Sequence, residues 1–439
     1  MLKKLLSILF VMALLLTTVS FGPALAEEAV TDPWNIVAAD VTGNLTVYRY
    51  YADADKDNLD YAIEKMQEKY PNLTINVEAR IGSDGEALRS WAAVGELPDI
   101  FEVNTQDVYD LLKDNGDLYV LDDVVEATHF YDLFSNGAAA KAARTNADGH
   151  QYSFGCEASN LGGLWYNTEL FASLGISEPT NYEEFKNVIQ ILKDAGKTPL
   201  SLFSAEKWPA TTLYSYACIA EGVDAGIDPI STGDAKITDE AYVKGAEKFL
   251  EIANMGAFSS SALTTNYQQA YEAVYNQEAG FFLSGAWFFL GLEGDGMGET
   301  IQWCKYNPFA DPEVAEDRRY HAFGGVQTEM KYSVNTNPPS GLDSETVAIL
   351  GMEMEWWSRV SAGVNGVMTT AIGNFTFSGS TGYKEYFDLY GNYETFSNFT
   401  GDLGNAEFLN AIDNACELVV SGNITTAEDF INDLAEQGY

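Results

Sequence analysis

Short apolar runs alternate with amphipathic segments along most of the chain. The first such run, Leu45–Tyr51, is rich in β-forming residues and predicts a strand. A helix that ends at Pro71 is predicted after it, because apolar residues recur at helical spacing at Leu59, Ile63, Met66 and Tyr70. Thr74–Val77 predicts the next strand. Strands that alternate with helices indicate an α/β fold with a largely parallel sheet.

The same pattern repeats in a second block of the chain. Leu161–Tyr166 and Thr198–Leu202 predict strands, and Thr168–Leu174 predicts a short helix between them. Two further segments, Thr180–Glu183 and Thr425–Glu428, carry the capping-box pattern that marks the start of a helix. The sequence therefore predicts two α/β regions with no long linker between them.

Length and charge narrow the functional classes. The chain has 439 residues, which is more than one hydrophobic core usually supports, so two domains or lobes are expected. Its 24 basic and 65 acidic residues give a formal net charge of −41, while 46% of the residues are hydrophobic. Such an acidic surface repels nucleic-acid phosphates and anionic lipids. A folded protein with a neutral or cationic ligand fits this balance best.

The first 26 residues have the features of a signal peptide. Lys3 and Lys4 are followed by the apolar run Leu5–Val19, and Ala24–Ala26 has the small-x-small form of a cleavage site. An uncleaved membrane anchor is disfavoured, because a spanning helix needs roughly 20 apolar residues. We therefore expect export to the periplasm, to the extracellular space or to the cell surface.

Cysteines and histidines are few and scattered. No CxxC pair and no HExxH motif occurs among Cys156, Cys218, Cys304, Cys416, His129, His150 and His321. This spacing predicts no zinc site, and no cofactor is expected. The first cysteine, Cys156, lies far beyond the expected cleavage point, so no lipid anchor through an N-terminal cysteine is expected.

Five segments in a fixed order carry a family resemblance: Trp91–Phe101, Gly163–Phe171, Asn181–Lys193, Lys207–Pro209 and Ala279–Trp287. They contain, among others, an x-Pro-Asp strand start, a Tyr-Asn-x-x-Leu-Phe strand and an Ala-x-x-x-x-Gly-x-Trp strand and turn. Together they resemble the extracellular solute-binding proteins (family 1) of carbohydrate ABC importers, a group that includes maltose-binding protein. The chain departs from the second motif where threonine replaces the usual lysine.

The resemblance implies a two-lobed α/β clamshell of type II, with two mostly parallel sheets and a hinge of several segments. It divides the chain into a signal peptide (1–26), a first lobe (27–157 and 306–362) and a second lobe (158–305 and 363–439). Cys156 and Cys304 would then fall in neighbouring hinge crossings, so a disulfide between them is left open.

The function that the resemblance implies is non-catalytic. Such a receptor captures a sugar or oligosaccharide in the cleft between its lobes, works as a monomer and delivers the ligand to an ABC permease. An exported glycoside hydrolase or a glycan-binding surface protein stays open as an alternative. Hydrolysis needs only two suitably spaced carboxylates, and 65 acidic residues provide many pairs.

Three aromatic residues are candidates for stacking on a sugar ring. Trp287 follows Gly285 where the family places a stacking tryptophan, although a core position is the alternative. Trp208 precedes Pro209, and it either binds ligand or packs at the rim. The resemblance also implies a late aromatic contact, for which Phe375 is the candidate.

Polar candidates lie at the expected cleft. Glu157 and Asn160 fall at the first hinge crossing, where the family has a polar contact. Asn104 and Gln106 follow the x-Pro-Asp strand at its carboxyl end, where open α/β sheets bind ligands, with helix capping as the alternative. Gly325 either lets backbone approach the ligand or makes a turn.

The acidic segment Asp53–Asn58, with Glu64 at its twelfth position, nearly copies a calcium-binding EF-hand loop. The turn glycine is absent, however, so an acidic helix start favoured by the helix dipole is preferred. Because the resemblance places this segment at the cleft, Asp53 and Asp55 are also candidates for binding sugar hydroxyls.

Overall fold

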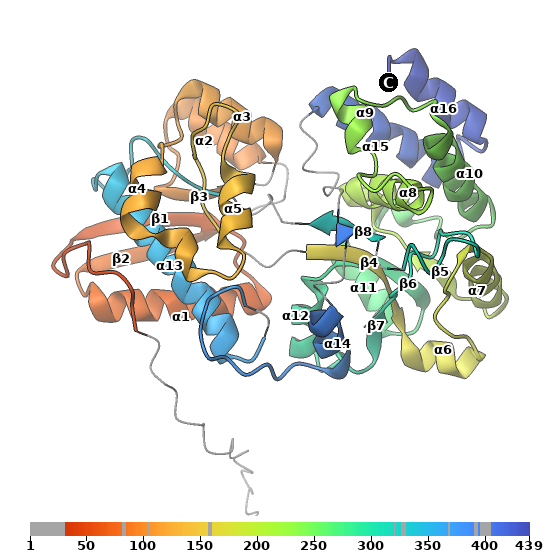
Figure 1. Cartoon of the computed structure of the whole chain (residues 1–439), viewed down its shortest axis with the longest axis horizontal. Coiled ribbons are helices and arrows are strands. Elements are labelled where there is room, and N and C mark those ends of the chain that lie inside the picture. Colours follow the sequence, from red (N-terminus) through yellow and green to blue (C-terminus); the bar gives the residue numbers. More distant parts are fainter. Residues whose placement is uncertain are drawn as a thin grey trace, which may run out of the picture. The chain divides into compact units, whose positions relative to one another are not determined.

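In a computed structural model the chain divides into a short N-terminal unit, Met1–Pro33, and a main unit, Trp34–Tyr439. The expected signal peptide lies outside the described residues. The structure describes residues 31–80, 85–103, 105–156, 160–319, 321–325, 331–367, 369–389, 394–395 and 405–439. Within the part described, no helix is long and apolar enough to span a membrane. The main unit contains two sheets, each with its own helices (Figure 1).

The sheet of the first lobe has four strands in the order β2-β1-β3-β9. They are β1 (Gly43–Arg49), β2 (Leu73–Ala79), β3 (Ile100–Val103) and β9 (Lys331–Val334). β1 runs parallel to β2 and β3, and only β9 is antiparallel to its neighbour. The two strands predicted first along the chain are confirmed to within a few residues, and this sheet is mostly parallel as expected.

Helices cover both faces of the first sheet. They are α1 (Asp53–Lys69), α2 (Glu86–Val94), α3 (Gln106–Asn115), α4 (Asp122–Thr128), η1 (Phe130–Leu133), α5 (Gly137–Arg144) and α13 (Ser344–Val364). Tyr48 and Arg49 are neighbours on β1 and therefore point to opposite faces. The Tyr48 ring packs edge-on against Trp91 of α2, with centroids 4.9 Å apart. Arg49 pairs with Glu355 of α13 at 3.8 Å.

The sheet of the second lobe is mixed. Its order is β10-β8-β4-β6-β5, and β7 also pairs with β4. The strands are β4 (Asn160–Asn167), β5 (Thr198–Ser201), β6 (Ala279–Gly285), β7 (Ile301–Trp303), β8 (His321–Gly325) and β10 (Glu394–Thr395). Most of its described strands still share one direction, as expected: β5 is parallel to β6 and β10 to β8, while the central β4 runs antiparallel to β6, β7 and β8. The alternation of apolar residues predicts a strand but not its direction.

A central helix of the second lobe is α8 (Trp208–Ala220), which is buried along nearly its whole length. Gly245 allows a close approach of α10, because a Cβ there would lie 2.6 Å from the Cys218 sulfur. The other helices are α6 (Thr168–Leu174), α7 (Tyr182–Asp194), η2 (Ser204–Glu206), α9 (Asp228–Thr232), α10 (Glu240–Asn254), η3 (Ala262–Thr264), α11 (Tyr267–Tyr275), α12 (Phe288–Gly294), α14 (Thr381–Leu389), α15 (Ala406–Val420) and α16 (Ala427–Glu436).

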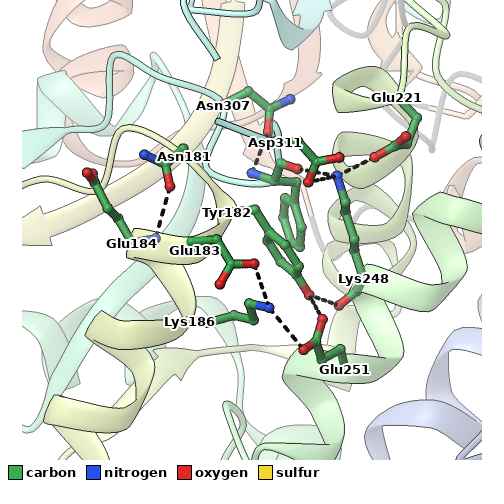
Figure 2. Close-up of polar contacts among 11 residues, drawn as sticks. Asn181, Tyr182, Glu183, Glu184, Lys186, Glu221, Lys248, Glu251, Asn307 and Asp311 are labelled. Atoms are coloured by element: carbon green, nitrogen blue, oxygen red, sulfur yellow. Dashed lines mark hydrogen bonds and ion pairs between the residues drawn. The ribbon is translucent and has the colours of Figure 1, made fainter. Parts of the chain in front are cut away.

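A buried lysine ties several of these elements together. Lys248 of α10 is only 9% exposed and donates to the Phe309 carbonyl oxygen at 2.8 Å. Figure 2 shows the carboxylates of Glu221 and Asp311 at its ammonium group, the second at 3.0 Å. Because Glu221 follows α8, this one cation joins α8, α10 and the segment after β7. Loss of one partner would leave an uncompensated buried charge, so removal of Lys248 is expected to destabilise the second lobe.

Both predicted capping boxes are displaced by one residue. The cap of α7 is Asn181, whose side chain accepts the Glu184 N–H at 3.1 Å. The cap of α16 is Thr426, which accepts from Asp429. In each pair of adjacent polar residues either one is suited to capping, and packing of the apolar face selects the second.

Two of the expected segment boundaries need correction. β8 pairs with β4, so His321–Gly325 belongs to the second sheet and not to the first lobe, where the expected range 306–362 placed it. Ala371 pairs with Phe134 of the first lobe, so the last return to the second lobe lies later than residue 363. The other boundaries remain predictions. Cys156 and Cys304 are both buried, and the structure joins neither of them in a disulfide.

Candidate ligand-binding site

One edge of the second sheet gathers four of the predicted site residues. Asn160, the first residue of β4, pairs with Gly325, the last residue of β8. The final residue of β6, Gly285, pairs with Gly162 on the other side of β4. β5 is parallel to β6 and ends at the same edge. Trp208 follows β5 and Trp287 follows β6, so both lie after the carboxyl ends of strands, where α/β sheets bind ligands.

The ring of Trp287 is held on two sides. Its Nε1–H donates to the Tyr267 hydroxyl oxygen at 3.2 Å. Its six-membered ring lies against Gly285, where a Cβ would come within 2.1 Å of Cζ3. Trp287 is half-buried and packs against the hydrophobic core of the second lobe, and its role in binding stays a prediction. Glycine at 285 thus makes room for the indole.

Trp208 stands beside Trp287 at the start of α8. The two indoles have centroids 6.3 Å apart at an angle of 67°. Trp208 packs edge-on against Phe203 at 5.1 Å, and its Nε1–H donates to the Glu206 carboxylate at 3.3 Å. The residue before it, Lys207, has a φ of 60°, which is unusual for a lysine and turns the chain sharply into α8.

Tyr267, Ser284 and Glu206 complete this group, and sequence reasoning missed all three. The Tyr267 hydroxyl lies 3.3 Å from Ser284 Oγ, and the backbone N–H of Tyr267 donates to Glu206 at 3.2 Å. Tyr267 opens α11, whose start is marked by a capping box between Asn266 and Gln269. The capping-box pattern in the sequence could have identified Tyr267, because it places this aromatic residue at the start of a helix that directly precedes the β6 motif.

Burial raises the pKa of the Tyr267 phenol well above its ordinary value, so the hydroxyl stays neutral at physiological pH. A neutral phenol both accepts from Trp287 and donates to an oxygen acceptor. The edge therefore combines two half-buried indoles with hydroxyl and carboxylate groups. Indoles stack on apolar C–H faces, and the oxygens form hydrogen bonds to hydroxyl groups.

A second group of candidates lies in the first lobe. β1 and β3 are parallel neighbours, so the segments after their carboxyl ends share one edge of the first sheet. Asp55, in the first turn of α1, follows β1 and is half-buried. Gln106 opens α3 after β3 and donates to Asp110 at 2.9 Å. Thr105 is the N-cap residue of α3, although its side chain makes no capping bond.

Some candidates are placed only in part. Asn104 and Glu157 lie outside the described residues. The backbone of Asp53 begins α1, and that of Asn160 begins β4. Phe375 is half-buried and packs against the end of α13, where a Cβ on Gly363 would lie 2.5 Å from its ring.

The calcium alternative for the acidic segment is wrong. An EF-hand loop must curl around its ion, but α1 is a continuous helix from Asp53 to Lys69. The segment is the acidic helix start that was preferred.

The sequence of the chain matches one known protein family over strands of both sheets. The model for the bacterial extracellular solute-binding protein family matches residues 49–303, more than half of the chain. The chain belongs to this family. The match runs from the end of β1 through β7, so it includes both tryptophans of the solute-binding protein's candidate site.

Curated relatives of this solute-binding protein are distant. It is 26% identical over 294 residues to an uncharacterised ABC transporter extracellular-binding protein of Pyrococcus horikoshii, and the match covers 65% of the chain and 64% of that relative. It is 20% identical over 244 residues to the multiple sugar-binding protein of Streptococcus mutans, covering 53% and 56% of the two chains. The matched regions thus span somewhat under two thirds of these relatives.

Solved structures show the same fold over nearly the whole length. A chitin oligosaccharide binding protein superposes with a TM-score of 0.73 at 17% identity, covering 90% of this chain and 98% of its own. A solute-binding protein in complex with raffinose gives a TM-score of 0.65 at 17% identity, covering 90% and 98%. The prediction of a two-lobed, type II solute-binding fold is confirmed.

Proposed function

We propose that this solute-binding protein is a receptor that captures a sugar or oligosaccharide and delivers it to an ABC permease. The observation that carries the proposal is the group at the edge of the second sheet, in which Trp208 and Trp287 stand 6.3 Å apart beside the Tyr267 hydroxyl. Two rings at an angle provide two stacking surfaces for pyranose C–H faces. The names of relatives, which include sugar-binding and chitin oligosaccharide binding proteins, support this ligand class.

The remaining candidates are proposed to provide hydrogen bonds, except Phe375, which would make an aromatic contact with the sugar. Asp53, Asp55, Asn104 and Gln106 would act from the first lobe, while Glu157, Asn160, Gly325 and Phe375 would act near the segments that join the lobes. Ligand bound to both lobes favours a closed state over an open one, because only the closed state makes both sets of contacts. Closure would present a surface to the permease, and the receptor would work as an exported monomer.

A thermal-shift screen tests the ligand class. Maltotriose, cellotriose, xylotriose, chitotriose and raffinose are added separately at neutral pH. A ligand that binds only the native state raises the melting temperature by mass action, so at least one sugar is expected to do so. Small-angle scattering with that sugar should then show a smaller radius of gyration.

The alternative of an exported hydrolase predicts a different result with the same sugars. A receptor leaves the oligosaccharide intact after prolonged incubation. Release of monosaccharide in excess over the protein would refute the receptor and favour the hydrolase. No thermal shift with any sugar would count against a carbohydrate ligand.

A further inference from the structure

A carboxylate beside Trp208 connects three elements at the edge of the second sheet. Glu206 ends η2, between β5 and α8, and it is exposed. Its Oε2 accepts the Trp208 Nε1–H at 3.3 Å, and its Oε1 accepts the backbone N–H of Tyr267 at 3.2 Å. The two carboxylate oxygens are therefore bonded to different helices, one to α8 and the other to α11.

The backbone at Lys207 explains why side chains only two residues apart meet. Lys207 lies between Glu206 and Trp208 with a φ of 60°, and its N–H donates to the Ser204 carbonyl oxygen at 3.1 Å. In a regular helix, residues two positions apart do not face each other. The bond between the carboxylate and the indole therefore depends on this turn.

Tyr267 supports both indoles. Its backbone N–H lies in the first turn of α11, where N–H groups have no acceptor within the helix and the helix dipole favours a carboxylate. Its hydroxyl oxygen accepts the Trp287 Nε1–H at 3.2 Å. Tyr267 thus holds Trp287 directly and holds Trp208 through Glu206.

These bonds determine what each group offers to a ligand. An indole has one N–H donor, and in both tryptophans it points to a protein acceptor, so the rings offer apolar surface. An ionised carboxylate has about four acceptor positions, of which the described residues occupy two in Glu206. Because an indole N–H lies in the plane of its ring, the carboxylate lies beside the edge of Trp208. The hydroxyl groups of a sugar stacked on that ring project toward the same edge.

We propose that Glu206 is a specificity-determining residue that fixes the Trp208 ring against the start of α11 and accepts hydrogen bonds from hydroxyl groups of the sugar stacked on this ring. A group that only accepts requires donors, so the ligand is a sugar whose stacked residue keeps its hydroxyl groups free. A sugar with blocked hydroxyl groups would cover the carboxylate and leave it unpaired, which is costly. This inference rests on the proposed function.

The first test needs no ligand. The emission and acrylamide quenching of Trp208 are obtained as the difference between each protein and the same protein with Trp208→Phe. In Glu206→Ala the indole loses its bond, so its emission should shift and its quenching should increase. Glu206→Gln keeps one acceptor oxygen, and a smaller change is expected.

Glu272→Ala is the matched control, because Glu272 is an exposed carboxylate of α11 that accepts from Gln268 within the same helix. It should leave the Trp208 signal unchanged. Circular dichroism checks that each variant is folded, and Glu206→Gln carries both tests if the alanine variant does not fold. An unchanged Trp208 signal in Glu206→Ala would overturn the positioning role.

The second test uses whichever sugar of the five-member panel gives the largest thermal shift, with affinity measured by isothermal titration calorimetry. Its dissociation constant is expected to be at least roughly tenfold higher in Glu206→Ala than in the parent, and unchanged in Glu272→Ala. In the Trp208→Phe background, Glu206→Ala should still raise it roughly threefold, because direct bonds to the sugar do not need the indole N–H. No further increase in that background would overturn the direct contact.

The outcomes separate this inference from the proposed function. If no sugar binds while the Trp208 signal responds to Glu206→Ala, the proposed function fails and the positioning role of Glu206 stands. If a sugar binds the parent and Glu206→Ala with equal affinity, the inference fails and the proposed function stands.

Discussion

Trp287 donates a hydrogen bond from its indole N–H to the hydroxyl oxygen of Tyr267, at 3.2 Å. The two residues come from different elements, one from the turn after β6 and the other from the first position of α11. This bond fixes the rotation of the indole plane, while Gly285 beneath the ring fixes its height above the sheet. A ring held in this way loses little side-chain entropy when a ligand stacks on it.

Removing the Trp287 ring should therefore abolish most sugar binding. Trp287→Ala loses the stacking area and the edge contact with Trp208, and we expect the dissociation constant to rise at least roughly tenfold, about 1.4 kcal/mol. Trp287→Phe keeps a ring but loses the bond to Tyr267, for which a smaller increase is expected. Isothermal titration calorimetry measures both. Affinity within twofold of the parent for the alanine variant would exclude Trp287 from the site.

Gly285→Ala should disturb the site without touching the ligand directly. The new methyl group would fall 2.1 Å from Cζ3 of Trp287, so the indole has to move off its position. Loss of affinity similar to that of Trp287→Ala is expected, with the native circular dichroism spectrum retained. Gly291→Ala on α12 is the matched control, because a Cβ there meets nothing within 4 Å. Unchanged affinity in Gly285→Ala would show that sugar binding does not depend on the position of the Trp287 indole.

The buried lysine cluster predicts a large stability effect at one position of α10 and a small effect at another. Lys248→Met leaves Glu221, itself 10% exposed, without its cation, and we expect a loss of about 3 to 5 kcal/mol in the free energy of unfolding. Lys244→Met removes an exposed lysine paired with Glu240 one turn earlier, and a change within about 0.5 kcal/mol is expected. Urea unfolding followed by circular dichroism compares the two. Equal effects would contradict a stabilising role of the cluster.

Stability should also depend on pH through Asp413, a buried carboxyl group of α15. Its pKa is about 6 in the folded protein against an ordinary value of 3.8, so the folded state binds the proton more tightly than the unfolded state. The contribution of this group is therefore complete below about pH 4 and is lost as the pH rises through 6. The free energy of unfolding of the parent, relative to Asp413→Asn, should fall by about 3 kcal/mol over this range. A constant difference between pH 3.5 and 7 would contradict the raised pKa.

Local patterns in the sequence determined much of the secondary structure. The spacing of apolar residues predicted β1, α1 and β2, and the short helix predicted at Thr168–Leu174 has the same bounds as α6. These elements follow from interactions within a few residues, which the sequence displays directly. The choice of Trp287 as a candidate came instead from the family resemblance, which rests on the Gly-x-Trp motif at a strand end.

Only the tertiary structure decided the direction of the strands, the boundaries of the segments and the residues that contact Trp208 and Trp287. The direction of β4 against β6 depends on how the chain enters the second sheet, which hydrophobic alternation does not encode. Tyr267 and Glu206 reach the tryptophans because α8 and α11 begin at the edge where β6 ends. The pairing of Asp413 with Thr211 spans 202 positions. Contacts of that range arise from the packing of whole helices, and no pattern within one segment of the sequence specifies them.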